Sequence, residues 1–303
     1  MKIISKEAIK TREYWIEEIR KLSGNFGDDS DRLEKELINE INKLGAAPLI
    51  NHLRLCGDIP ESYSHDSSEE KLYSKYTDAL LSETYKILGL RSLVLKERAD
   101  AADVEVFAKS YSFIADAKAF RLSRTAKNQK DFKVQAMDGW KRGKPYAMVV
   151  CPIYQLPTKS SQIYEQACAR NVCIFTYSHL AVLVSFSLLE SKQKVEELIH
   201  EIFKVVQALN PSKDASLYWL AVNRTMLNFS SKIADLWQIE KQAAVESIII
   251  AKEEALTFLA NERDKIMHMN HEEALKALIE VHRIENRIIV IKSVSDNNIL
   301  GIR

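Results

Sequence analysis

Asp103, Asp116 and Lys118 are the residues of this chain whose types and spacing favour catalysis. Asp116 and Lys118 flank Ala117, and alternate residues of a strand point to one face, so their side chains would project together. Asp103 begins a preceding alternating run, and a hairpin would bring its carboxylate near Asp116. Two such carboxylates repel unless a cation lies between them, and Mg²⁺ prefers oxygen ligands. The pattern therefore indicates metal-assisted hydrolysis of a phosphodiester, with Lys118 holding or deprotonating the attacking water.

An acid-x-Lys triplet alone is common, so its surroundings decide its meaning. The chain has four such triplets: Glu69–Lys71, Asp116–Lys118, Asp131–Lys133 and Glu190–Lys192. Only the one at Asp116 lies within an apolar strand, where burying an acid is costly unless something offsets it. A purely structural ion pair between Asp116 and Lys118 is the main alternative to a metal site.

A basic segment follows this triplet. The net charge of the whole chain is only +1, but residues 118–144 contain nine basic and two acidic residues, a local net charge of +7. Such a concentration in a neutral protein indicates one face that meets phosphates, although a solvated helix face is the alternative. Asn128 or Gln129 would suit adenine, and Arg124 or Lys127 would suit guanine. The candidate DNA-binding residues are Arg121, Ser123, Arg124, Lys127, Asn128, Gln129, Lys130 and Lys133.

Helices and strands must position these residues. Apolar spacings of three and four predict helices, and short alternating or apolar runs predict strands. Residues 62–70 are polar and predict a loop. The predicted helices are 8–22, 33–44, 73–90, 125–140, 161–169 and 179–189, and the predicted strands are 104–108, 111–122, 146–154 and 173–177. This order indicates an α/β fold, a mixed sheet flanked by helices.

The chain from Ser191 onward is almost wholly helical in its pattern. Residues 233–267 form one long helix or two, and Asn270 with Glu273 resembles a capping box that opens the next helix. We therefore expect three regions: an N-terminal helical region (1–66), a catalytic and DNA-recognition core (67–190) and a helical region (191–303) that serves packing, dimerisation or DNA clamping.

Composition excludes several classes of protein. No apolar stretch reaches the roughly 18 residues of a transmembrane helix, and the N-terminus turns polar early, so we expect a cytoplasmic protein without membrane contact. The four cysteines lack paired metal-site spacing and are expected to be reduced and mostly buried. Neither a glycine-rich phosphate loop nor a nucleophile elbow is present.

At these residues the chain resembles a known family. Asp103 followed by Asp116-x-Lys118 is similar to the pattern of the PD-(D/E)xK nucleases, and the run Ala115–Val134 is similar to HindIII-type type II restriction endonucleases. Ser161–Tyr164 and Asn171–Phe175 are also similar, and the resemblance spans about residues 70–183. One departure is Ala102, where the wider pattern has proline.

The resemblance implies a fold, a reaction and partners. The fold would be restriction-endonuclease-like with a large helical C-terminal region. Such enzymes are homodimers that use Mg²⁺, recognise AAGCTT in double-stranded DNA, cut between the two adenines and leave 5′ overhangs. A companion DNA methyltransferase in the host, not a stable subunit, would protect the host's own sites.

The resemblance also implies roles for individual residues. Asp103 and Asp116 would ligate Mg²⁺, the carbonyl of Ala117 would add a ligand, and Lys118 would position the water. The family also uses a glutamate from the helix before the first strand, and Glu83 is the best-placed match; a solvent-facing Glu83 is the alternative. Two other functions stay open: a non-enzymatic DNA-binding protein on an inactive nuclease fold, and a less specific repair nuclease.

Overall fold

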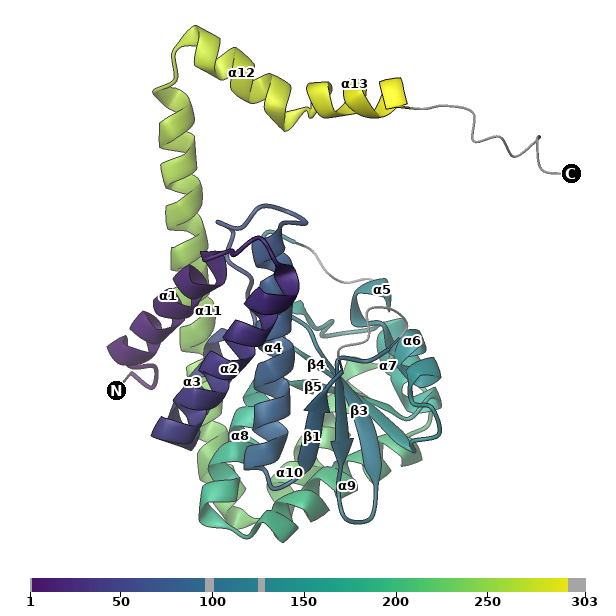
Figure 1. Cartoon of the computed structure of the whole chain (residues 1–303). Helices are drawn as coiled ribbons and strands as arrows, with labels where there is room; N and C mark the ends of the chain where they lie inside the picture. The colour runs from purple at the N-terminus through teal and green to yellow at the C-terminus, as the bar shows by residue number, and fades with distance from the viewer. Residues whose placement is uncertain (1, 96–100, 125–128, 294–303) are drawn as a thin grey trace, which may run out of the picture. The chain divides into compact units, whose positions relative to one another are not determined.

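Five strands form one mixed sheet in the order β1-β2-β3-β4-β5 (Figure 1). The computed structural model describes residues 2–95, 101–124 and 129–293. The strands are β1 (Arg91–Val94), β2 (Val104–Phe107), β3 (Ser112–Ala117), β4 (Tyr146–Cys151) and β5 (Val172–Thr176). The first three strands pair antiparallel, whereas β3, β4 and β5 run parallel. The predicted mixed sheet is confirmed, with β1 as a strand that the sequence analysis missed.

The three parallel strands are buried along almost their whole length, as parallel strands covered by helices on both faces must be. β3 is shorter than the predicted 111–122. The chain leaves the sheet after Ala117, because the N–H of Phe120 turns away to donate to the carbonyl of Gly57 at 3.1 Å. Residues 118–122 are therefore not strand.

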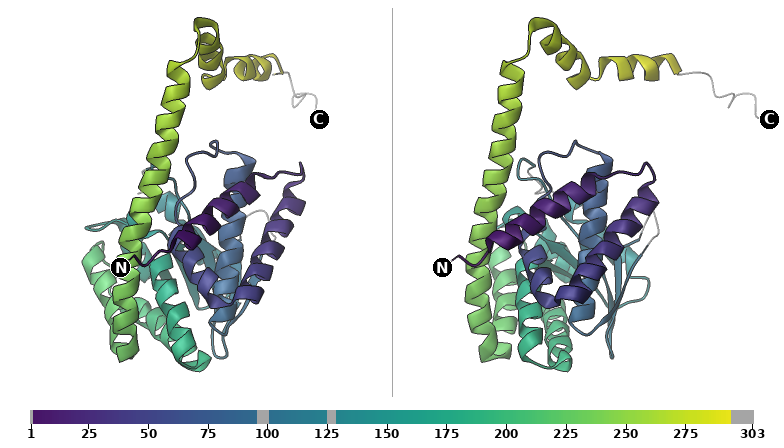
Figure 2. Two further views of the ribbon diagram at one scale, coloured as in Figure 1. Left: turned by 90° about the vertical axis from the view of Figure 1, so that its left-hand side faces the viewer. Right: turned by 60° about the vertical axis from the view of Figure 1, so that its left-hand side comes forward.

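Four helices precede the sheet: α1 (Lys6–Arg20), α2 (Phe26–Leu44), α3 (Ala46–Leu55) and α4 (Ser68–Ile87). α4 packs on β1, β2 and β3, and α2 lies beside α4 in both views of Figure 2. The predicted loop 62–70 ends earlier than expected, because the side chain of Ser67 accepts from the N–H of Glu70 and opens α4. α3 was not predicted from the sequence.

The region between β3 and β4 was predicted as one helix, 125–140. Residues 125–128 lie outside the described part, and the rest forms two short helices, α5 (Gln129–Phe132) and α6 (Val134–Trp140). Lys133 separates them because its backbone is left-handed, with φ of 49°. α6 and the following α7 (Gln162–Ala169) pack on β4 and β5, on the side of the sheet away from α4 in Figure 1. A short 3₁₀ helix, η1 (Ile153–Gln155), follows β4.

The C-terminal part is helical, as predicted. Its helices are α8 (Tyr177–Leu189), α9 (Lys192–Ala208), α10 (Ala215–Phe229), α11 (Ser231–Met267), α12 (His271–Val281) and α13 (Ile284–Ser293). α11 settles the choice between one long helix and two. The capping box at Asn270 and Glu273 is confirmed. None of the described helices is both long and apolar enough to cross a membrane.

One core joins the N-terminal helices, the sheet and the helices up to the start of α11; it includes Trp15, Tyr85, Phe113 and Val222. Contacts divide the chain into two units, Met1–Ala255 and Leu256–Arg303. Within the first unit, α11 is bound to α1 beyond the middle of its length, because Arg12 pairs with Glu254 at 2.9 Å. The functional division into 1–66, 67–190 and 191–303 stays a prediction.

Candidate active site

The pairing of β2 with β3 brings Asp103 and Asp116 together. Val104 lies opposite Ala115, so the next step of the antiparallel register places Asp103 opposite Asp116. Directly opposed side chains on one face have Cβ atoms about 5 Å apart. The N–H of Leu95 donates to the carbonyl of Asp103 at 2.8 Å, which continues the ladder with β1 past the end of β2. The hairpin expected from the sequence is therefore present.

Lys118 projects beside Asp116 and forms an ion pair with it. Its backbone is fixed on both sides: its N–H donates to the carbonyl of Val150 at 2.8 Å, and the hydroxyl of Tyr177 donates to its carbonyl at 3.0 Å. β4 and α8 thus hold the lysine one residue past the end of β3. Ala117, between the two charged residues, is buried.

α4 contributes two further charges that the sequence analysis missed. The ammonium of Lys75 lies 2.9 Å from the carboxylate of Asp78 and 3.8 Å from that of Asp103. Asp78 is buried in the middle of α4, within a stretch that is buried from Tyr76 to Tyr85. The signal in the sequence was an acid inside an otherwise buried helix, one turn after a lysine. That signal does not say which strand the helix covers.

The carboxylates repel one another and shift each other's pKa. Burial raises the pKa of Asp78 to about 6, although the charge of Lys75 opposes this shift. Burial, followed by the charges of Asp78 and Asp116, raises the pKa of Asp103 well above its ordinary value. Burial would also raise the pKa of Asp116, but Lys118 and a hydrogen bond with Asp103 together hold that pKa below its ordinary value. Asp116 is therefore the carboxylate that stays charged most readily.

This set of side chains fits a divalent cation. The cluster has three carboxyl groups, on Asp78, Asp103 and Asp116, against the two ammonium groups of Lys75 and Lys118. A bound cation would supply the positive charge that lets all three carboxyl groups ionise. Both carboxylate oxygens of Asp116 are buried, and the partners of this carboxylate are the ammonium of Lys118 and the carboxyl group of Asp103. Carboxylate oxygens are the ligands that Mg²⁺ prefers, and a bound cation would replace the proton that Asp103 and Asp116 share.

The ion pair considered as an alternative exists, but it is not closed off from solvent. Within the pair, the side chain of Asp116 is fully buried (0% exposed) and that of Lys118 is 12% exposed, and the neighbouring Asp103 is 28% exposed. Lys118 also lines an open cavity of about 270 Å³, together with Lys71, Arg124 and Lys133, and three acids share this lining: Asp66, Glu70 and Asp131. A phosphate group could therefore approach the lysine through an opening in which basic residues outnumber acidic ones by one.

Glu83 is not part of this cluster. It lies on α4 as predicted, but it is buried and pairs with Lys86 at 2.6 Å. Glu83 follows Asp78 by five residues, which rotates its side chain well away from Asp78 around a helix of 3.6 residues per turn. The acid of α4 that lies near Asp103, through Lys75, is Asp78, and the role expected for Glu83 stays a prediction.

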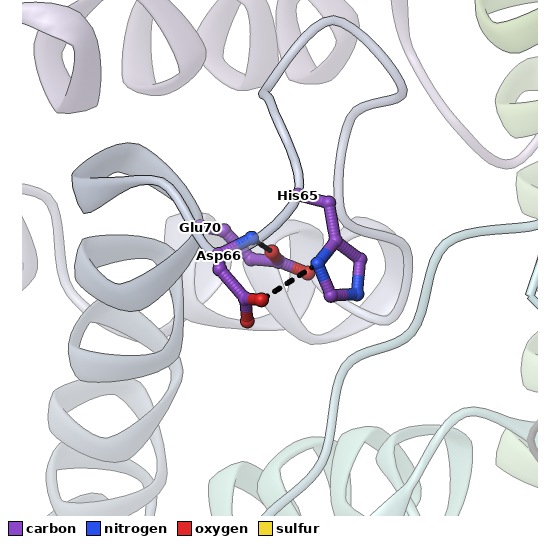
Figure 3. A group of neighbouring side chains, drawn as sticks. All are labelled: His65, Asp66 and Glu70. Atoms are coloured by element: carbon purple, nitrogen blue, oxygen red, sulfur yellow. Dashed lines mark hydrogen bonds and ion pairs between the residues drawn. The ribbon is translucent and has the colours of Figure 1, made fainter. Parts of the chain in front are cut away.

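A second group of possible metal ligands lies at the start of α4, on the preceding loop and the first helical turn (Figure 3). Among the described residues, His65, Asp66 and Glu70 bring one ligand atom each within 4.8 Å of one another. His65 and Asp66 are exposed, with their side-chain atoms 2.9 Å apart. Glu70 accepts from the N–H of Asp66 at 2.7 Å. These bonds order the loop that leads into α4.

The predicted DNA-binding residues differ in their freedom to move. Arg121 is held in place: its side chain is 12% exposed, donates to the carbonyl of Ser64 at 3.0 Å and lies 3.4 Å from Glu70. Ser123 donates through both its N–H and its hydroxyl to Glu61. Arg124 is 53% exposed and pairs with Asp131 at 2.9 Å.

The remaining candidates lie in or beside α5. Lys133 places its ammonium 5.4 Å from the ring centre of Trp140. Gln129 and Lys130 belong to α5, but their side chains lie outside what the structure describes, as do Lys127 and Asn128 altogether. Sequence reasoning missed Gln155, which is buried and donates to the carbonyls of Arg121 and Arg124, and so fixes the first turn of the basic segment.

A mixed sheet of this order, flanked by helices and carrying two opposed aspartates with an acid-x-Lys sequence, defines a restriction-endonuclease-like fold. A family model described as HindIII restriction endonuclease matches residues 12–295. The chain is also 36% identical over 269 residues to the type II restriction enzyme HindIII of Haemophilus influenzae, which covers 85% of this chain and 87% of that protein. The chain belongs to the HindIII restriction endonuclease family. The resemblance expected over about 70–183 therefore extends through the N-terminal helices and into α13.

Proposed function

We propose that this protein is a type II restriction endonuclease that uses Mg²⁺ to hydrolyse both strands of duplex DNA. Its site would be AAGCTT, cut between the two adenines to leave 5′ overhangs. The observation that carries the proposal is the convergence of Asp103, Asp116 and Lys118 at one end of the β2–β3 hairpin, beside an opening lined by four basic and three acidic residues. Family membership supports the same reaction.

The residues of the chain have distinct roles in this proposal. Asp103, Asp116 and the carbonyl of Ala117 would hold Mg²⁺, which when bound neutralises charge at the phosphorus and acidifies a water. Lys118, fixed by β4 and α8, orients the attacking water and the scissile phosphate. Lys75 and Asp78 act through Asp103: the ammonium between the two carboxylates sets the position of Asp103.

Reading a palindromic site implies twofold symmetry, so we propose that the active form is a homodimer. Arg124 and Lys133 are the best-placed described residues for contact with DNA, because their cationic groups line the opening beside Lys118. A companion methyltransferase would protect the host's copies of the site. The reaction would take place in the cytoplasm, where the host keeps its DNA.

Digestion of DNA of known sequence, with and without Mg²⁺, tests this function. The expected products are discrete fragments whose sequenced ends all fall within one hexamer, and only when the metal is present. A smear would identify a less specific repair nuclease. Tight DNA binding without any cleavage, over a range of divalent ions, would identify an inactive DNA-binding protein.

Two acids on α4 offer a matched comparison. Asp78→Asn should lower the cleavage rate by about 10- to 100-fold, as replacement of groups that orient a metal ligand does. Glu83→Gln, five residues on, should lower it far less, because Glu83 pairs with Lys86. If Glu83→Gln instead lowered the rate more than Asp78→Asn, Glu83 would be the acid of α4 that belongs to the active site. Thermal unfolding of both variants separates loss of fold from loss of activity.

A further inference from the structure

The last two helices, α12 and α13, expose apolar faces that no described residue covers. α12 has no buried residue. Leu275, Leu278 and Ile279 follow helical spacing on one side of it and are 47%, 55% and 46% exposed. Glu272 borders this apolar side, and the other charged residues of α12 lie farther around the helix: Glu273, Lys276 and Glu280.

α13 exposes apolar side chains around most of its circumference. Ile284, Ile288 and Ile291 follow helical spacing on one side and are 40%, 37% and 70% exposed, and Ile289 and Val290 on other sides are 64% and 62% exposed. The segment 256–269 before α12 adds further exposed apolar side chains: Leu256, Leu259, Ile266, Met267 and Met269. A monomer rarely exposes a continuous apolar surface of this size, so the second unit is built to contact another surface.

We propose that α12 and α13 form the contact between two copies of this chain, each copy's α12 lying against the partner's α13. This inference rests on the proposed function only in that a palindrome calls for a dimer. A typical stable interface buries about 800 Å² on each partner. Large apolar side chains exposed by roughly a third to three quarters along α12, α13 and the end of α11 supply an area on that order.

The charges favour a second copy over a membrane or an unrelated partner. α12 carries three acids and one lysine, a net charge of −2. Residues 283–293 carry Arg283, Arg287 and Lys292 with Glu285, a net charge of +2. Antiparallel pairing across a twofold axis therefore sets an acidic helix against a basic one, twice. An anionic membrane would instead require a helix with a predominantly basic polar face.

Sedimentation of the full-length protein over a range of concentrations tests the contact. The unaltered chain should be a dimer, and Leu275→Lys with Leu278→Lys should weaken dimerisation at least tenfold. Glu201→Lys on α9 is the control, because it adds the same two units of positive charge to an exposed site in the first unit. An unaltered chain that stays monomeric, or a double variant that dimerises as tightly as the control, would overturn the proposal.

The pairing of α12 with α13 has its own test at low salt. Glu272→Lys and Lys292→Glu should each weaken the dimer, and the variant with both changes should recover much of the lost affinity. Glu272→Lys also breaks the ion pair between Glu272 and Lys276 within one copy. Comparing the double variant with the two single variants in a double-mutant cycle cancels that separate effect. Additive losses would overturn this orientation. Cleavage is measured separately. A dimer that fails to cut DNA would refute the proposed function but leave the proposed contact standing. A monomer that cuts DNA would refute the proposed contact but leave the proposed function standing.

Discussion

Asp103 and Asp116 face each other with like charge, which costs stability whenever no cation lies between them. Asp103→Asn should therefore stabilise the metal-free protein, by about 1 kcal/mol in its free energy of unfolding. The same change should slow cleavage by about 10³-fold, because a metal ligand is lost and several kcal/mol of charge stabilisation are lost with it. Urea unfolding without metal, together with a plasmid assay with Mg²⁺, measures both. A variant that loses stability would show that the two carboxylates do not repel.

Asp78 gives the metal-free protein a defined pH dependence. Its pKa is about 6 in the folded state, above its ordinary value near 4, so the folded state binds more protons than the unfolded state between these values. The contribution of Asp78 to the free energy of unfolding should thus be greatest below about pH 4 and fall by roughly 1–2 kcal/mol by about pH 6.

Urea unfolding of the metal-free protein at several pH values measures this slope. Asp78→Asn, which cannot ionise, is the control and should flatten the curve between about pH 4 and pH 6. An unaltered slope in that variant would assign the effect to other groups.

The positions of Asp116 and Lys118 could be predicted from the sequence, because a period of two and a single apolar strand were enough to pair them. The opposition of Asp103 to Asp116 could be expected once a hairpin was assumed. The presence of Asp78 and Lys75 in the site could not be predicted, because it depends on how α4 packs across the sheet. Side-chain spacing within one helix does not contain that information.

At the scale of elements, the turn after β3 decides which basic residues are free to contact DNA. Arg121 is anchored to Ser64 and Glu70, whereas Arg124 is more than half exposed. Arg121→Ala should therefore lower the free energy of unfolding by about 1–2 kcal/mol, because a hydrogen bond from a charged group and the ion pair with Glu70 are both lost.

Arg124→Ala should leave stability nearly unchanged and act on DNA instead. If Arg124 reads a base, discrimination between the cognate site and a site with one altered base pair should fall by about 1–3 kcal/mol. Unfolding curves and competition binding on both variants distinguish the two roles. Equal loss of affinity for cognate and random DNA in Arg124→Ala would make it a phosphate contact.

Most helices and strands could be predicted because periodicity and caps are local signals. Asn270 with Glu273 is such a signal, and so is the Ser67 cap, although the polar residues around Ser67 concealed it. β1 was missed because its pattern is inverted: the polar Ser92 is buried, whereas the apolar Leu93 is exposed. The break at Lys133 was missed because nothing in the residue type announces a left-handed backbone.

At the scale of the whole molecule, a net charge of +1 hides a basic segment of +7. DNA affinity should follow the local contacts and not the total charge. Without Mg²⁺, Lys133→Ala should weaken binding to any duplex and lower the slope of log affinity against log salt by about 0.9, the value for one phosphate contact. Glu201→Lys raises the net charge by two units far from the opening and should leave that slope unchanged. Titrations at several salt concentrations measure both, and a slope that tracks total charge would contradict the prediction.

The β2–β3 hairpin also limits which insertions and deletions the gene can tolerate. Its tip, where the N–H of Ala108 donates to the carbonyl of Tyr111, lies far along both strands from the two aspartates. Extra codons at the tip would leave both carboxylates facing each other. One codon gained or lost between Asp103 and Phe107, or between Ser112 and Asp116, would turn one carboxylate to the opposite face. Such a change would disable the enzyme as thoroughly as replacing an aspartate, although every catalytic residue would still be encoded.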